Sequence, residues 1–319
     1  MGCRFGLSAR PGSMIEEHFV PRVMAQSKNQ FGHKSRAQQS SSAYPTVSGR
    51  WLLAALGLSL PGAFLCTWAV FCLLFWQGSW QLLYHPASTV AHTPASVGLA
   101  FDPVSFATGN SGVAQLQGWW IPSNSAHYTA LYLHDQSGNL GDTLPTLTAL
   151  HASGLNVLAF DYRGYGQSRF VHPSEASWLQ DATWALDYLT GTRHIDVHSV
   201  VIVGSGLGAD LALELAAAHS DSRAVVVHFP IYAPANTIFN DPRAKFVPAP
   251  LLVRDRYDLA ASASALRVPS LWLTREDATQ QAIDSIYQQV KAPKTRVVLR
   301  GDETMAKSLQ RWLSNLGNK

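Results

Sequence analysis

The sequence predicts an α/β domain built on a mostly parallel sheet, preceded by one membrane-spanning helix. Two observations carry this prediction. From about residue 97, apolar strand patterns alternate with helical patterns, and this alternation is typical of a parallel sheet covered by helices on both faces. Ahead of it, residues 51–76 form an apolar run without a charged residue. The length of 319 residues allows one large domain or two smaller ones.

The first 50 residues are polar, rich in Ser and Gln, and poorly patterned. We expect a disordered basic tail over residues 1–50. Seven basic residues lie in it: Arg4, Arg10, Arg22, Lys28, Lys34, Arg36 and Arg50. The net charge of +3 therefore describes this tail in part rather than a basic globular face, so no nucleic-acid partner is expected.

Residues 51–76 run for 26 positions without a charge, which is enough to cross a hydrocarbon core of roughly 30 Å. Trp51 at one end and Trp76, Trp80 and Tyr84 at the other suit the two membrane interfaces. The alternative is a buried helix of the domain. A cleaved signal peptide fits less well, because the apolar stretch is too long and starts too late.

The charges that flank the apolar segment are asymmetric. Basic residues precede it, and none follows until Arg163. The positive-inside rule then predicts a single-pass membrane protein with a cytoplasmic N-terminus. Residues 77–319 would form the domain on the periplasmic or extracellular side.

We expect strands and helices to alternate along the domain. Strand patterns cover residues 113–121, 128–134, 155–161, 200–203, 223–229, 270–274 and 295–299. Helical patterns cover residues 140–152, 174–190, 207–219, 278–291 and 303–316. Between them, a proline-rich stretch from about 230 to 268 is expected to be irregular and cap-like.

Cysteine usage gives no sign of a disulfide framework or a metal site. The three cysteines are Cys3, Cys66 and Cys72, and none lies in the α/β domain. No Cys/His spacing typical of a metal site occurs. We therefore expect no metal and no cofactor.

One stretch, "VVIVGSGLGAD" at residues 200–210, fits two chemistries. An apolar strand runs into a glycine-rich turn that opens a helix. This layout is shared by the nucleophile turn G-x-S-x-G of serine hydrolases and by the dinucleotide-binding turn G-x-G-x-x-G/A. A dinucleotide site also needs an acidic residue at the end of the next strand. His228 and Phe229 stand there instead, which favours the hydrolase interpretation.

The segment "LYLHDQSGNLGDTLPTLTALHASGLNVLAFDYRGYGQS", residues 131–168, resembles membrane-anchored α/β-hydrolases of the serine-aminopeptidase-like branch. Members of that branch carry an "HGNxGN" oxyanion loop after one strand and a "DYRGYGxS" turn after the next. The second motif is intact here as "FDYRGYGQS". The resemblance covers about residues 80–316 and implies the α/β-hydrolase fold with a Ser-His-Asp hydrolase site.

The nucleophile turn departs from the family pattern. Its five positions are Gly204, Ser205, Gly206, Leu207 and Gly208. The family's nucleophile position is therefore Gly206, and Ser205 stands one place early. Because successive strand side chains face opposite ways, we expect Ser205 to point away from the pocket mouth. We expect Gly206 to adopt a positive φ.

The other catalytic positions are altered too. Asp277 in "LWLTREDATQ" matches the family's triad acid, but a helix cap is favoured because Gln280 follows three residues later. The family's histidine position holds Glu303 or Thr304, and His228 is the last histidine of the chain.

The oxyanion loop is changed as well. Its first two positions are His134 and Asp135, and Leu207 follows the nucleophile position. A carboxylate at Asp135 would repel a developing oxyanion, unless the side chain faces solvent.

These departures predict a membrane-anchored α/β-hydrolase-fold protein that is catalytically degenerate. It would bind a small ester-like or acyl ligand, or a protein partner. The alternative is an active esterase, lipase or peptidase with an unusual constellation in which Ser205 pairs with His228. A less favoured alternative is a dinucleotide-binding oxidoreductase that uses "GSGLGA".

Overall fold

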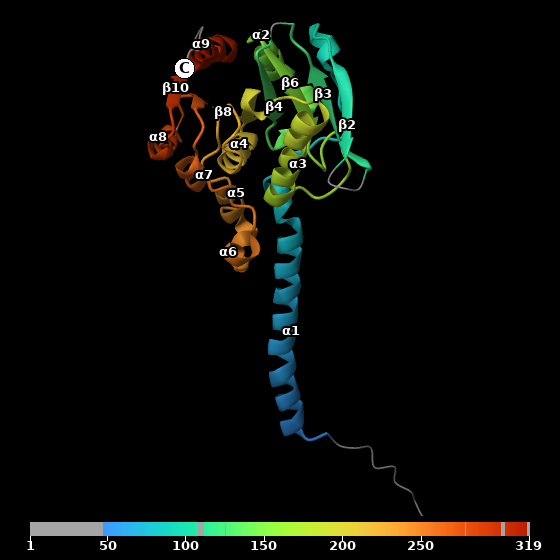
Figure 1. Ribbon diagram of the computed structural model, residues 1–319. Coiled ribbons are helices and arrows are strands. Elements are labelled where there is room, and N and C mark those ends of the chain that lie inside the picture. The colour runs from blue at the N-terminus through green and yellow to red at the C-terminus, as the bar shows by residue number, and fades with distance from the viewer. Residues whose placement is uncertain (1–46, 108–111, 125, 278, 301–303, 318–319) are drawn as a thin grey trace, which may run out of the picture. The chain divides into compact units, whose positions relative to one another are not determined.

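The computed structural model describes residues 47–107, 112–124, 126–277, 279–300 and 304–317 (Figure 1). Most of the expected N-terminal tail, residues 1–46, lies outside the described residues. Residues Gly57–Lys319 form one compact unit.

An eight-stranded sheet with the strand order β10-β9-β8-β7-β4-β6-β3-β2 forms the centre of this unit. Six neighbouring strands from β10 to β6 are parallel, whereas β3 is antiparallel to both β6 and β2. The predicted mostly parallel sheet is therefore confirmed. The strands are β2 (Asp102–Ala107), β3 (Ala114–Ile121), β4 (Tyr128–Leu133), β6 (Leu155–Asp161), β7 (Val200–Ser205), β8 (Ala224–His228), β9 (Ser270–Thr274) and β10 (Lys294–Val298).

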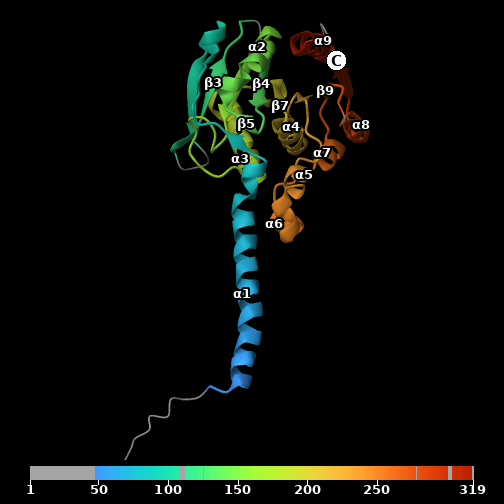
Figure 2. The same cartoon turned by 180° about the vertical axis from the view of Figure 1, so that it is seen from behind.

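Helices cover both faces of the sheet. Strand residues alternate between two buried clusters, as Leu131 and Tyr132 of β4 illustrate. One cluster packs against α2 and α9, and the other against α3, α4, α7 and α8. The helices of the domain are α2 (Leu144–Ala152), α3 (Glu175–Asp187), α4 (Leu207–Ala218), α5 (Ala235–Phe239), α6 (Ala249–Leu252), α7 (Leu259–Ala265), α8 (Gln280–Gln289) and α9 (Met305–Gly317). Figure 2 shows the same arrangement from behind.

Short helical turns complete the chain. They are η1 (Ser79–Leu82), η2 (Pro94–Val97), η4 (Leu140–Thr143), η6 (Val197–Ser199) and η7 (Pro242–Phe246), and a π-helical turn, η5 (Tyr188–Thr192), extends α3. In addition, β1 (His85–Pro86) pairs in parallel with β5 (Ser137–Gly138). This short pairing joins the chain that follows the first helix to the loop that follows β4.

Two elements differ from the sequence expectations. The edge strand β2 was not expected; it contains Pro103, and proline is depleted in strands and confined to their edges. The stretch 230–268 is not irregular but holds α5, η7, α6 and α7. Asp241 and Asp258 cap two of these helices by accepting from backbone N–H groups. Helices of four to seven residues are too short for a helical period to be read from sequence.

The first helix, α1 (Gly49–Gly78), contains Pro61 and continues into η1. Together Gly49–Leu82 make 34 residues with a mean hydropathy of 2.0 over the most apolar window. In the described part of the chain, this is the one helix that is long and apolar enough to span a membrane.

Candidate functional site

A cavity of about 620 Å³ opens at the carboxyl ends of β4, β7, β8 and β9. Ligands bind at this edge in parallel sheets because polar side chains from several strands meet there. Its lining includes Tyr132, Asp135, Ser205, Gly206, His228, Arg275 and Asp277.

The turn between β7 and α4 has the geometry of a nucleophile elbow. Gly206 has φ +57° and ψ −123°, which confirms the positive φ expected there; only glycine adopts such a φ without strain. The flanking glycines allow close packing. A Cβ on Gly204 would overlap the backbone of Gly208, and a Cβ on Gly208 would overlap backbone carbonyls at the end of β4.

The carboxylate of Asp135 occupies the space beside Gly206. Its Oδ1 accepts hydrogen bonds from the N–H of Leu207 at 2.9 Å and from the N–H of Gln136 at 2.8 Å. A Cβ built on Gly206 would overlap this carboxylate. In a nucleophile elbow, the N–H after the nucleophile and an N–H of the loop after the neighbouring strand are the donors that hold an oxyanion. Asp135 thus does not simply face solvent.

Two opposing effects act on the Asp135 carboxyl. Burial raises its pKa, while the N–H groups of Leu207 and Gln136 and the charge of Arg275 lower it, and burial is the larger effect. Leu207 is also the first residue of α4. An anion at this place is stabilised by the exposed N–H groups of the helix N-terminus.

Ser205 does not point away from the cavity, so that expectation is wrong. Its Oγ lies 2.8 Å from Nδ1 of His228, and both side chains line the cavity. Ser205 and His228 are register partners on the parallel strands β7 and β8, so their side chains share one face of the sheet. The strand alternation does not extend to Gly206, because its positive φ is not strand geometry.

The imidazole of His228 lies in an environment that disfavours its charged form. Burial, followed by the positive charge of Arg275, lowers the pKa of His228 to about 4. The side chain is therefore neutral at pH 7.

An aromatic and cationic cluster beside His228 was missed by the sequence analysis. Phe229 has φ +49°, a conformation that a bulky residue rarely adopts and that is found at functional sites. The centroid of its ring lies 4.1 Å from the centroid of the His228 ring, and Cζ of Arg275 lies 3.8 Å from the centroid of the Phe229 ring. The available signal was position: Arg275 directly follows β9, at the edge where the other site residues gather.

Asp277 lines the cavity, and its Oδ1 accepts from the N–H of Thr279 at 2.8 Å and from its hydroxyl at 2.6 Å. These bonds lower the pKa of Asp277. Among the described residues, no hydrogen bond joins it to a histidine. At the family's histidine position, Glu303 lies outside the described residues, while Oγ1 of Thr304 accepts from the N–H of Lys307 at 3.3 Å and caps α9.

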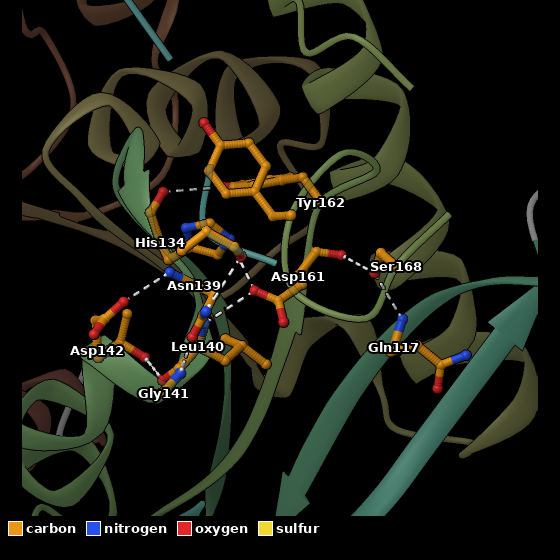
Figure 3. Close-up of polar contacts among 12 residues, drawn as sticks. Gln117, His134, Asn139, Leu140, Gly141, Asp142, Asp161, Tyr162 and Ser168 are labelled. Carbon is orange, nitrogen blue, oxygen red and sulfur yellow. Dashed lines mark hydrogen bonds and ion pairs between the residues drawn. The ribbon is translucent and has the colours of Figure 1, made fainter. Parts of the chain in front are cut away.

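His134 contacts the backbone of the loop that carries Asp135 and is not among the cavity-lining residues. It is buried; its Nδ1 lies 2.7 Å from the carbonyl of Asp135, and its Nε2 lies 3.6 Å from Oδ1 of Asp161. The same Oδ1 accepts from the N–H of Leu140 at 2.9 Å (Figure 3). Burial lowers the pKa of His134 to about 4 and raises that of Asp161 to about 7.

The turn after β6 completes this support. The hydroxyl of Ser168 donates to the carbonyl of Asp161 at 2.5 Å and accepts from the N–H of Gln117 at 2.9 Å (Figure 3). The motif "DYRGYGQS" thus joins the loop that carries Asp135 to strand β3.

Comparison with known families agrees with this geometry. The model of the family described as serine aminopeptidase, S33, matches residues 132–309, more than half of the chain. The chain belongs to this family of α/β-hydrolases. The glycine-rich turn at residues 200–210 is accordingly the hydrolase turn of the S33 fold rather than a dinucleotide-binding turn.

Relatives of this S33 chain match over part of their length. An uncharacterised protein of Mycobacterium tuberculosis is 32% identical over 146 residues, 45% of this chain and 51% of the relative. Protein bem46 of Schizosaccharomyces pombe is 35% identical over 94 residues, 29% and 31% of the two chains. The α/β-hydrolase domain-containing protein WAV2 of Arabidopsis thaliana is 28% identical over 138 residues, 42% and 44%. The chain spans about half or less of the length of these relatives.

Solved structures share the fold. An esterase of Pyrococcus furiosus superposes with a TM-score of 0.56 at 19% identity, over 74% of this chain and 96% of the esterase. An α/β-hydrolase of a Penicillium species gives a TM-score of 0.55 at 16% identity, over 69% and 99% of the two chains. At these identities the likeness concerns the fold alone.

The buried Asp161 carboxyl gives a prediction for stability against pH. Its folded pKa of about 7 lies above the ordinary 3.8, so the unfolded chain ionises first as the pH rises. The free energy of unfolding of the wild type, relative to that of Asp161→Asn, should therefore be greatest below about pH 4. It should fall between about pH 4 and 7 and stay constant above about pH 7. Each pKa unit corresponds to about 1.4 kcal/mol.

Urea unfolding of the detergent-solubilised protein, followed by tryptophan fluorescence, measures this difference. The exposed Asp187→Asn change serves as the control and should leave the pH profile unaltered. A constant difference between wild type and Asp161→Asn from pH 4 to 8 would contradict the prediction.

Proposed function

We propose that this S33 family member is a membrane-anchored protein that has lost acyl-enzyme chemistry and binds a small ligand in its cavity. The observation that carries the proposal is the Asp135 carboxylate, which accepts from both oxyanion donors, the N–H groups of Leu207 and Gln136. It does so in the space that a nucleophile side chain on residue 206 would fill.

An acyl-enzyme mechanism needs a nucleophile, a base and donors for the oxyanion. Gly206 has no side chain, and the histidine expected after β10 is absent from the sequence. An oxyanion would also have to displace the Asp135 carboxylate from two charge-assisted hydrogen bonds, each worth about 1.5–3 kcal/mol. The missing nucleophile and the occupied donors are mutually consistent, because the carboxylate and a side chain on residue 206 compete for one volume.

The cavity itself is retained, and this supports ligand binding. Its volume of about 620 Å³ lies within the roughly 300–1,000 Å³ typical of small-molecule sites. Its lining residues include Tyr132, Ser205, His228 and Arg275, whose side chains carry polar groups. A small ester-like or acyl ligand would find hydrogen-bond donors there.

Restoring the nucleophile tests the proposal. Gly206→Ser alone should destabilise the protein by about 1–3 kcal/mol, because its Cβ overlaps Asp135. Asp135→Gly should relieve this overlap and free both donors, so the two changes should couple by about 0.5–3 kcal/mol. Thermal unfolding measures the coupling, and a fluorophosphonate probe measures nucleophile reactivity. We expect no labelling of wild type above a heat-denatured control and clear labelling of the double variant, increased further by Thr304→His.

Gly191→Ala is the matched control for the glycine substitution, because a Cβ there meets no atom within 4 Å. Wild-type labelling as strong as that of the double variant would sink the proposal, provided that Ser205→Ala removed it.

A second candidate function rests on the Ser205–His228 pair at 2.8 Å: a hydrolase in which Ser205 is the nucleophile and His228 the base. A base with a pKa of about 4 stays deprotonated down to about that pH. Activity on a short-chain p-nitrophenyl ester should then persist well below pH 6.5, the ordinary pKa of histidine. His228→Asn and Ser205→Ala should each abolish it, and activity that survives both changes would rule out this candidate.

We propose that α1 crosses the membrane with the basic tail in the cytoplasm and the domain on the periplasmic or extracellular side. The asymmetry of basic residues around residues 51–76 supports this orientation. A C-terminal alkaline phosphatase fusion should be active in a bacterial host, whereas a C-terminal green fluorescent protein fusion should be dark. An inactive phosphatase fusion together with a fluorescent green fluorescent protein fusion would indicate the opposite topology.

A further inference from the structure

The segment that contains α5, η7 and α6, residues 235–256 and here termed the cap segment, contacts the side of α1. Nε1 of Trp68 donates to the carbonyl of Phe246 at 2.8 Å. Cζ of Arg254 lies 5.3 Å from the centroid of the Trp76 ring. In both views the cap segment lies beside the C-terminal half of α1 (Figures 1 and 2).

The Trp68 contact sets the level of the cap segment along α1. A helix rises 1.5 Å per residue, so about 20 residues span the hydrocarbon core of a membrane, which is about 30 Å thick. A core that begins at Trp51, where the apolar run starts, ends at about residue 70. A core centred on residues 51–76 ends at about residue 73. In both registers Trp68 lies within the core, and it brings Phe246 to that level.

The cap segment exposes large apolar side chains at this level. Phe246 is 67% exposed and Leu251 is 83% exposed. In the described part of the chain both side chains are open to solvent, and exposed apolar surface marks a contact with a protein partner or a membrane. The occupant that the Trp68 contact favours is the same bilayer that would surround α1.

Basic residues lie close to Phe246 and Leu251 in the sequence. Arg243, Lys245, Arg254 and Arg256 are all exposed on the cap segment. Arg243 pairs with Asp241, and it also lines a small apolar cleft of about 120 Å³ with Phe71, Phe75 and Leu82 of the anchor. Long basic side chains can keep apolar stems in the membrane and place their charges at phosphate groups.

We propose that the cap segment is a second membrane contact, in which Phe246 and Leu251 insert among acyl chains and the basic residues meet lipid phosphates. The partner is a lipid bilayer surface. This inference rests on the proposal that α1 spans the membrane, and it adds a monotopic contact to a single-pass anchor. Ile231 and Tyr232, which line the cavity, shortly precede the cap segment in the sequence.

Spin labels on the full chain in lipid nanodiscs test the inference. The background carries Cys3→Ser, Cys66→Ala and Cys72→Ala, and one nitroxide label is attached at Leu251→Cys. Collision with oxygen, which concentrates in lipid, is compared with collision with a water-soluble nickel chelate. We expect the ratio of oxygen to nickel collisions at position 251 to be several-fold higher than at a label in water.

Matched labels separate the possible failures. Leu58→Cys, on α1 and 80% exposed, reports whether the anchor lies in lipid, and Val113→Cys, 64% exposed on the β2–β3 side, reports water. Lipid-like values at 58 and 251 support the inference. A lipid-like value at 58 with a water-like value at 251 overturns the inference but still supports a membrane-spanning α1. The same holds if a protein partner, rather than lipid, covers the cap segment. A water-like value at 58 overturns the membrane anchoring itself. Phe246→Cys replaces Leu251→Cys if the latter does not fold.

Discussion

The arrangement of the site depends on one pair of hydrogen bonds, those from the N–H groups of Leu207 and Gln136 to Oδ1 of Asp135. They join the start of α4 to the loop after β4 through a side chain rather than through a bound ligand. In the hydrolase fold the same two donors face an empty hole until a substrate arrives. Here the Asp135 carboxyl accepts from both N–H groups, so each has a partner within the chain.

The surrounding residues agree with that pair. Gly206 has room for the carboxylate because it lacks a Cβ. His134 and Asp161 fix the loop from beneath by contacts to backbone groups. Arg275 supplies a positive charge that stabilises the Asp135 carboxylate and disfavours a charged His228. One cation therefore favours the charged form of Asp135 and disfavours the charged form of His228.

Most of the fold was predictable from sequence, because buried parallel strands are long apolar runs and "DYRGYG" marks one defined turn. Positive φ at Gly206 followed from its place in the elbow. The direction of Ser205 did not, because the strand alternation ends at Gly206, whose positive φ is not strand geometry. Its pairing with His228 depends on the register of β7 against β8, which no single strand encodes. The position of the Asp135 carboxylate was also out of reach, since it depends on an empty volume at Gly206, 71 residues away in the chain. The short helices between residues 235 and 265 escaped prediction because four to seven residues are too few to show a helical period.

The pairing of β1 with β5 ties the chain that follows α1 into the domain. His85 donates its N–H to the carbonyl of Gln136, and the carbonyl of Ala87 accepts from the N–H of Gly166 and from Nδ2 of Asn139. A protease that cut within Ser79–Leu82 would release a domain with these bonds intact. Cleavage a few residues later, past Ala87, would instead strip backbone partners from the loop that holds Asp135. Cuts that only detach α1 and cuts that disturb the site therefore lie less than ten residues apart in the chain.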